Sequence, residues 1–173
     1  MRDSRKVMDN LDLRILKILQ NSGRKKNAEL ARELGVPPST MLERIRRLED
    51  SGVLRGYRAT LDPNMLGLSV QAFISVILSR HESDIIRKFE EGIRQIPNVR
   101  ACYNLTGRFD YLLHVATKDL DQLGKLIKTQ ITALPGFGKS ESFLVLSEVK
   151  SDEGLPVAQD LPDSSKKPER VNP

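Results

Sequence analysis

The spacing of apolar residues changes partway along this chain of 173 residues, and that change limits the folds it can adopt. From residue 9 to residue 61, apolar side chains recur three and four positions apart, which is the period of a helix. From residue 67 to residue 150, strand-like and helix-like patterns alternate. Asp-Pro and Gly lie between the two regions and favour turns. The sequence therefore predicts four parts, at residues 1–61, 62–67, 68–150 and 151–173.

The fourth part is predicted to be a disordered tail, because residues 151–173 contain four prolines and few large apolar side chains. Apolar runs elsewhere stay short of the roughly 18 residues that indicate a membrane span. The charged start of the chain lacks the apolar core of a signal peptide. We therefore expect a cytoplasmic protein with no membrane partner.

Residue types that commonly carry catalysis or bind metals are scarce in this chain. Its single cysteine, Cys102, excludes an internal disulfide framework. The two histidines, His81 and His114, lie far apart in the sequence, so a paired metal site is not expected. Phosphate-binding loops, nucleophile elbows and zinc spacings are missing from the sequence. We expect no catalytic residues, no metal and no cofactor, and therefore a protein that is not an enzyme.

The first domain is predicted to contain three short helices and a wing. Asp9 can cap the first helix, which Gly23 ends. The second helix, 27–34, begins with a capping asparagine, and Pro38 suits the first turn of the third. The third helix buries Met41, Ile45 and Leu48. Residues 53–61 then form a short strand or hairpin, so the domain is typical of a winged helix-turn-helix.

Basic residues are concentrated at this end of the chain. Residues 1–62 carry a net charge of +5, whereas residues 63–150 carry +2 and residues 151–173 carry −2. This distribution favours double-stranded DNA as a partner, with the third helix in the major groove. The predicted DNA-facing residues are Ser39, Thr40, Glu43, Arg44, Arg46 and Arg47 on the helix and Arg55 and Arg58 on the wing. The alternative is a solvated basic face on a small helical bundle.

The second domain alternates strands and helices in the order βαββαβ. The predicted strands cover residues 72–78, 99–105, 111–117 and 143–149, with helices at residues 86–96 and 120–134. This order implies an antiparallel sheet with both helices on one face, a ferredoxin-like α+β fold. Phe73 and Ile77 give the first strand apolar residues on its other face as well. We therefore predict a homodimer in which a second copy covers that face.

Motifs spread over both domains carry a family resemblance. In the first domain they are Met8-Asp9-Asn10-Leu11-Asp12, Glu29-Leu30-Ala31, Arg44-Ile45, Gly52-Val53-Leu54 and Gly56-Tyr57. In the second they are Pro97-Asn98-Val99, Gly107-Arg108-Phe109-Asp110-Tyr111, Leu134-Pro135-Gly136 and Val149-Lys150. Together they resemble the Lrp/AsnC family of bacterial and archaeal transcription regulators, also called feast–famine regulators. The resemblance covers residues 8 to 156, and the tail beyond has no counterpart in it.

The resemblance implies a nucleoid-associated regulator that assembles from dimers into octamers or larger oligomers and binds a small effector, often an amino acid, between dimers. The implied effector residues are Asn104, Leu105, Thr106, Gly107, Arg108 and Asp110, with Gly138 and Ser140 from a loop of a neighbouring subunit. Glycine lets backbone amides approach a carboxylate, and Asp110 can accept bonds from an α-ammonium. The alternative is a plain hairpin in which Gly107 supplies a positive φ and Asp110 bonds the local backbone.

Two further readings of the sequence stay open beside the regulator. Tetrapyrrole (sirohaem-type) decarboxylases share this architecture, but they need a pocket rich in basic and histidine side chains. A DNA-organising protein would use assembly alone and no effector. One departure from the family pattern is Pro37-Pro38, since Pro37 has no capping side chain and the third helix is therefore expected to begin a residue later.

Overall fold

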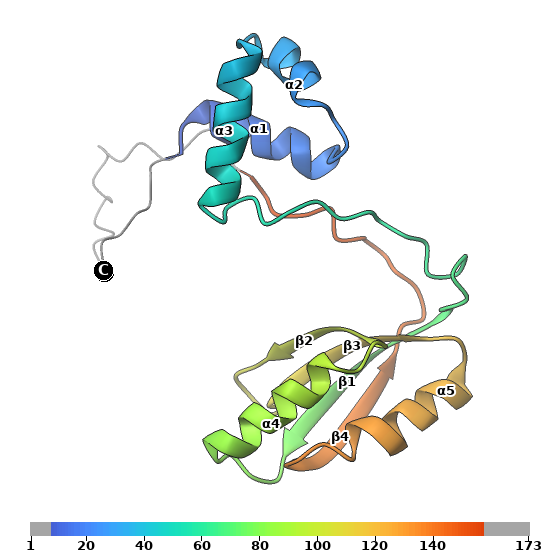
Figure 1. Cartoon of the computed structure of the whole chain (residues 1–173). Coiled ribbons are helices and arrows are strands. Elements are labelled where there is room, and N and C mark those ends of the chain that lie inside the picture. Colours follow the sequence, from blue (N-terminus) through green and yellow to red (C-terminus); the bar gives the residue numbers. More distant parts are fainter. Residues whose placement is uncertain (1–7, 158–173) are drawn as a thin grey trace, which may run out of the picture. The chain divides into compact units, whose positions relative to one another are not determined.

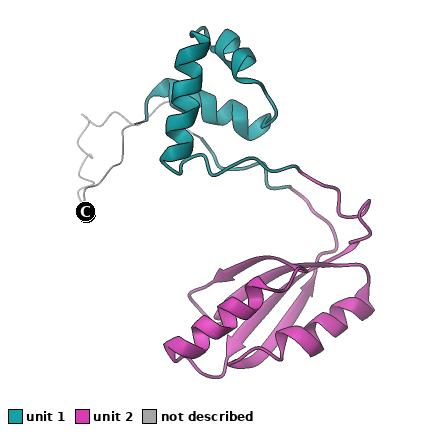
Figure 2. Cartoon of the chain, viewed as in Figure 1, with its two compact units in different colours: residues 1–59, 151–173 teal, residues 60–150 magenta. Residues whose placement is uncertain are grey.

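A computed structural model describes residues 8–157 of the chain (Figure 1). Contacts divide the chain into two compact units (Figure 2). The first unit consists of the described residues up to Ala59 together with those from Ser151 onward, and the second spans Thr60–Lys150. The chain therefore leaves the first unit, builds the second, and returns to the first.

The first unit contains three helices, α1 (Asn10–Asn21), α2 (Asn27–Leu34) and α3 (Pro38–Asp50). Their shared core consists of Ile15, Leu19, Leu30, Ala31, Met41, Ile45 and Leu48. The predicted cap of α1 is confirmed, because the Asp12 N–H donates to the Asp9 carboxylate at 2.9 Å. The Asp12 carboxylate in turn accepts from the Asp9 N–H at 3.2 Å, which completes a capping box.

The starts of the next two helices differ from the prediction. Lys26 occupies the N-cap position of α2, so Asn27 lies inside the helix and does not cap it. The helix ends at Gly35, whose φ of 68° requires a residue tolerant of the left-handed region. Pro38 lies in the first turn of α3 as predicted, but the expectation that the helix begins a residue later was wrong, because Pro38 is its first residue and Pro37 occupies the N-cap position. Proline at this position needs no N–H partner.

The wing is not a strand. Residues 53–61 were predicted to form a strand or hairpin, but they have no regular secondary structure in the structure. A hairpin needs a second segment to pair with, and after Gly56 the chain continues exposed into the linker. Tyr57 anchors the start of this segment, since its hydroxyl donates to Glu49 at 3.4 Å and its ring lies against Gly23.

The start of the predicted tail lies against α1. The Gln20 side-chain amide donates to the Leu155 carbonyl at 2.8 Å and accepts from the Leu155 N–H at 3.1 Å. Residues 151–157 thus have a defined partner in place of the predicted disorder. The rest of the predicted tail, residues 158–173, lies outside the described residues.

The second unit has the predicted βαββαβ order. Its elements are β1 (Val70–Leu78), α4 (Ser83–Arg94), β2 (Val99–Asn104), β3 (Tyr111–Thr117), α5 (Leu120–Lys125), the π-helix η1 (Leu126–Ile131) and β4 (Phe137–Leu144). The sheet order is β2-β3-β1-β4, and every pairing is antiparallel. Both helical segments cover one face of the sheet (Figure 1). The ferredoxin-like α+β architecture is therefore confirmed.

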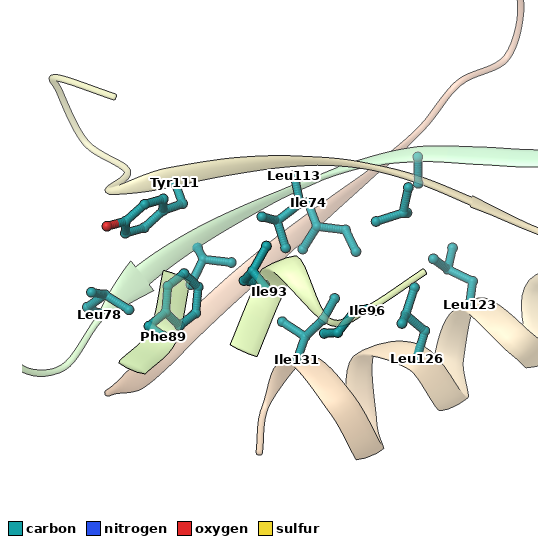
Figure 3. Packing of buried hydrophobic residues seen from close by; sticks show 13 residues of the cluster. Ile74, Leu78, Phe89, Ile93, Ile96, Tyr111, Leu113, Leu123, Leu126 and Ile131 are labelled. Atoms are coloured by element: carbon teal, nitrogen blue, oxygen red, sulfur yellow. The ribbon is translucent and has the colours of Figure 1, made fainter. Parts of the chain in front are cut away.

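The core of this unit lies between that face and the helices (Figure 3). The inward side chains of β1 and β3 include Ile74, Val76, Leu113 and Val115. The helices contribute Phe89, Ile93, Ile96, Leu123, Leu126 and Ile131. Alternation along each strand directs these residues to one face and leaves the others on the opposite face.

The last strand begins earlier than predicted. The sequence favoured 143–149, which is rich in apolar residues, but β4 covers Phe137–Leu144. Pairing with residues 72–78 of β1 decides the register, because it places Phe143 opposite Phe73 and Phe137 opposite Leu78. An edge strand tolerates the polar residues in between. Beyond the strand, the side chains of Leu146 and Val149 are each 96% exposed.

Candidate nucleic-acid and effector sites

The outer surface of α3 is the candidate DNA-reading surface. Met41, Ile45 and Leu48 face the core. Ser39, Glu43 and Arg46 are exposed on the other side of the helix, and Thr40 is partly exposed. These four side chains combine hydroxyls, a carboxylate and a guanidinium, which are the groups that read base edges or bind phosphates.

Two of the predicted DNA-facing arginines are instead held by acidic residues of α1. Arg44 contacts Asp9 at 2.6 Å and Asp12 at 2.9 Å, and Arg47 contacts Asp12 at 2.6 Å. The Asp12 side chain is only 1% exposed, so these two arginines take the place of water around it. The sequence did not reveal this network because its members lie more than 30 positions apart.

The same network shifts the ionisation of its exposed members. Burial by itself raises the pKa of Asp9, but the Asp12 N–H and the Arg44 guanidinium outweigh it and lower that pKa overall. The hydrogen bond to Asp9 likewise raises the pKa of Arg44. Both groups therefore stay charged over the physiological range, and the network joins α1 to α3 electrostatically. Arg44 and Arg47 therefore hold α3 against α1.

The two wing arginines have a different setting. Arg55 and Arg58 are exposed on the irregular segment after α3. Without a strand to fix their direction, their side chains are free to follow a nearby phosphate backbone. This arrangement suits sequence-independent contacts.

The turn between β2 and β3 contains most of the implied effector residues. Asn104, Leu105, Thr106, Gly107 and Arg108 are all exposed, and Gly107 has a φ of 125°. The Arg108 guanidinium lies 4.4 Å from the centre of the Phe109 ring. The turn therefore presents several polar groups and backbone amides to solvent.

Asp110 closes this turn and ties it to β1. Its Oδ2 accepts from the Leu78 N–H at 2.7 Å, and its Oδ1 lies 3.0 Å from His81 Nε2. Burial raises the pKa of Asp110, but the Leu78 N–H and His81 more than compensate and lower it. The carboxylate is therefore ionised at neutral pH. Within this chain it bonds backbone and histidine, as in the hairpin alternative, although the backbone partner lies on β1 and is not local.

Gly138 and Ser140 do not lie in a loop. Both belong to β4, where Ser140 is opposite Val76. A Cβ at Gly138 would lie 2.7 Å from the Ile77 carbonyl oxygen and 2.9 Å from the Ser79 nitrogen. Glycine at position 138 therefore allows β4 to approach β1 closely where their pairing is irregular.

A cavity of about 410 Å³ lies between α4 and the edge strand β2. Its polar lining includes Glu90, whose carboxylate accepts from the Tyr111 hydroxyl at 3.0 Å and from Arg94 at 3.2 Å. Cys102 also borders it. Although this residue keeps solvent contact, burial of its thiol and the nearby Glu90 raise its pKa to about 11. The thiol is therefore neutral and unreactive at physiological pH.

The sheet face opposite the helices carries a group of aromatic residues beside polar ones such as Lys139 and Glu141, and it is uncovered within the described chain. We call it the open face, and it includes Phe73, Tyr103, His114 and Phe143. The Phe73 and His114 rings stack with their centres 4.7 Å apart. Phe73 is 36% exposed and Phe143 is 43% exposed. Burial lowers the pKa of His114, with Arg100 adding to the effect, so the ring is neutral at pH 7.

Among residues 8–157, no three or more His, Cys, Asp and Glu side chains are placed to hold a metal ion. No helix in the same range is long and apolar enough to cross a membrane.

Comparison with known proteins yields two domain matches. Residues 8–55 match winged helix-turn-helix DNA-binding domains, and residues 71–155 match the Lrp/AsnC ligand binding domain. A leucine-responsive regulatory protein from Haemophilus influenzae is 34% identical over 87% of this chain and 90% of its own length. The protein of that name from Escherichia coli K12 is 35% identical over 87% of this chain and 92% of its own length.

Solved structures agree with these matches. A transcriptional regulator from Neisseria meningitidis, determined as a complex with L-Met, superposes with a TM-score of 0.82. It is 35% identical to this chain, and the match covers 87% of this chain and 97% of that one. The likeness therefore extends over both units and includes the arrangement of elements within them.

Proposed function

This chain belongs to the Lrp/AsnC family of transcription regulators, and we propose that it binds specific double-stranded DNA sites and changes that binding when an amino acid occupies its second unit. The observation that carries the proposal is the presence of both matched domains, DNA-binding and ligand-binding, in one chain. We further propose that it catalyses no reaction, uses no cofactor, and acts at the nucleoid in the cytoplasm.

On the DNA side, the exposed residues of α3 divide into two roles. Ser39, Thr40 and Glu43 lie toward the N-terminal part of the helix and read base edges. Arg46, together with Arg55 and Arg58 after the helix, contacts phosphates. Arg44 and Arg47 reach DNA only by sharing their guanidinium groups with Asp9 and Asp12, so their main contribution is to hold α3 in place.

On the effector side, the β2–β3 turn is the proposed site. Its exposed backbone amides around Gly107 suit a carboxylate, and ionised Asp110 suits an ammonium group. Asn104, Leu105, Thr106 and Arg108 surround these groups. The regulator from Neisseria meningitidis was solved with L-Met, which supports an amino acid as the ligand class here. Gly138 and Ser140 would contribute from the edge strand of a neighbouring subunit.

Assembly links the two sites. We propose that the open face packs against a second copy to form a homodimer, and that dimers associate into octamers or larger oligomers. An amino acid that touches two dimers stabilises the assembly in which it makes both sets of contacts. The number of DNA sites engaged together then changes with effector concentration, because linked binding events add avidity.

The test is fluorescence anisotropy with a labelled DNA fragment from upstream of the protein's own gene. Titrations of the full-length protein at two salt concentrations, with and without the twenty amino acids, measure DNA binding and its response to an amino acid. We expect binding that is tighter than to a random fragment, weakens with salt, and shifts with the amino acids. Arg46→Ala is expected to weaken binding and lower the salt slope by about one, as loss of one phosphate contact does.

Lys17→Ala provides the matched control, because Lys17 is an exposed basic residue on α1 and not among the proposed DNA-facing residues. It should leave DNA affinity nearly unchanged. Equal affinity for the specific and random fragments would contradict sequence-specific regulation. Specific binding that ignores all twenty amino acids would instead favour the DNA-organising function.

A further inference from the structure

His81 and Asp110 form a contact between two loops of the second unit. His81 follows β1 and precedes α4, and its side chain is 60% exposed. Its Nε2 lies 3.0 Å from Asp110 Oδ1. Asp110 is less accessible, with a side chain that is 27% exposed. The pair therefore combines a solvent-exposed histidine with a less exposed carboxylate in the β2–β3 turn.

The two oxygens of Asp110 have unlike partners. Oδ2 accepts from the N–H of Leu78, the last residue of β1. The backbone N–H of Asp110 also donates to the Val76 carbonyl at 3.0 Å, which holds the turn against the same strand. These bonds belong to the folded sheet and cannot be exchanged without opening it. Only the contact at Oδ1 involves a group that can rotate away into solvent.

An α-ammonium and an imidazole present the same feature to a carboxylate, which is an N–H donor. Both compete for Oδ1, since it is the one oxygen of Asp110 that faces an exposed partner. The neighbours of His81 in its loop, Arg80 and Glu82, are exposed, so the loop leaves the imidazole free to swing out.

We propose that His81 occupies the ammonium position of the effector site in the ligand-free protein, so that an amino acid binds Asp110 by displacing it. His81 then raises the effector concentration at which the protein responds. The inference rests on the proposed effector site at the β2–β3 turn, and it adds a residue that lies outside that turn and whose removal should strengthen binding.

The experiment measures amino-acid affinity in the full-length protein and in three variants. Each of the twenty L-amino acids is first screened by thermal shift, and the amino acid with the largest shift is titrated calorimetrically. His81→Ala is expected to bind it about two- to fivefold more tightly, the range that one exposed ion pair is worth. Asp110→Asn should lose most of the affinity. Glu82→Gln, an exposed neighbour in the same loop, is the control and should bind like the wild type.

A second readout follows the histidine directly. The chain contains only two histidines, so its imidazole NMR signals can be assigned by comparison with His81→Ala. On saturation with the amino acid, the His81 signal should move toward its position in Asp110→Asn, where the partner charge is gone. A His81 signal that stays in place at saturation would overturn the inference.

The outcomes separate the inference from the proposed function. If the wild type binds an amino acid and His81→Ala binds it equally or more weakly, the site stands and His81 is not the competitor. Amino-acid binding by His81→Ala but not by the wild type would support both the effector site and the inference. If neither protein binds any of the twenty amino acids, the effector site itself fails and the inference fails with it.

Discussion

At the scale of single residues, the most consequential side chain is Asp12. It completes the capping box of α1 and accepts from both Arg44 and Arg47 of α3. One buried carboxylate therefore fixes the start of one helix and the position of another. A buried charge with all its partners in place contributes little net stability, whereas removal of one member leaves the others without compensation.

We predict that Asp12→Asn lowers the free energy of unfolding by about 1–3 kcal/mol, because two guanidinium groups lose their shared partner. Arg44 and Arg47 remain partly solvated, with side chains 22% and 38% exposed, which limits the loss. The measurement is urea denaturation followed by circular dichroism. Asp50→Asn, at the exposed end of α3, is the control. Equal unfolding midpoints for Asp12→Asn and the wild type would refute the role assigned to this network.

At the scale of elements, the pairing of β1 with β4 is decided by backbone contact. The two strands approach closely at Gly138, where the register shifts between Ile77 and Leu78. Only a residue without a side chain allows that approach. Gly138 thus has a structural reason to be glycine that is independent of any ligand.

Gly138→Ala is expected to destabilise the second unit by about 1–3 kcal/mol, since its Cβ would collide with backbone atoms that cannot move alone. Gly124→Ala is the matched control, because Gly124 lies in α5 with open space around its Cβ position. This change should stabilise the helix by about 0.4–1 kcal/mol. Thermal unfolding of the two variants and the wild type would test whether Gly138→Ala lowers stability and Gly124→Ala raises it. A stable Gly138→Ala protein would mean that the strands tolerate the extra atom.

At the scale of the whole molecule, the second unit has one covered and one uncovered sheet face. The helices cover the face bearing Ile74 and Leu113. The open face presents Phe73 and Phe143 as cross-strand neighbours. Aromatic side chains that stay in solvent are characteristic of interaction surfaces. A second copy supplies a surface of the same composition and is the simplest partner.

We predict that Phe143→Lys weakens homodimer formation by roughly ten- to a hundredfold, as expected when an interface aromatic worth about 1.5–3 kcal/mol is lost. Analytical ultracentrifugation of the wild type and the variant measures the change. Leu120→Lys is the control, because Leu120 is also an exposed apolar residue, 60% exposed, but begins α5 on the helix side. If both variants sediment like the wild type, the open face does not form the dimer.

The sequence alone was sufficient for features that depend on neighbours along the chain. The spacing of Met41, Ile45 and Leu48 predicted the buried side of α3, and Pro38 was correctly expected in its first turn, although not as its first residue. The order βαββαβ followed from alternating periods, and β3 was predicted with its observed bounds. These features are readable because helix and strand periods reflect local backbone geometry. The motifs of the Lrp/AsnC family could also be recognised from the sequence, because each consists of residues that are neighbours along the chain.

Only the tertiary structure decided which distant groups meet. Arg44 and Arg47 face Asp12, more than 30 positions away, so their availability to DNA could not be read from their place on a helix. The register of β4 followed from β1, and apolar residues beyond Leu144 stayed exposed despite their strand-like pattern. Asp110, directly before β3, bonds Leu78 and His81, which lie 32 and 29 positions earlier in the chain. Such contacts depend on how chain segments pack, and local periodicity contains no information about the partner.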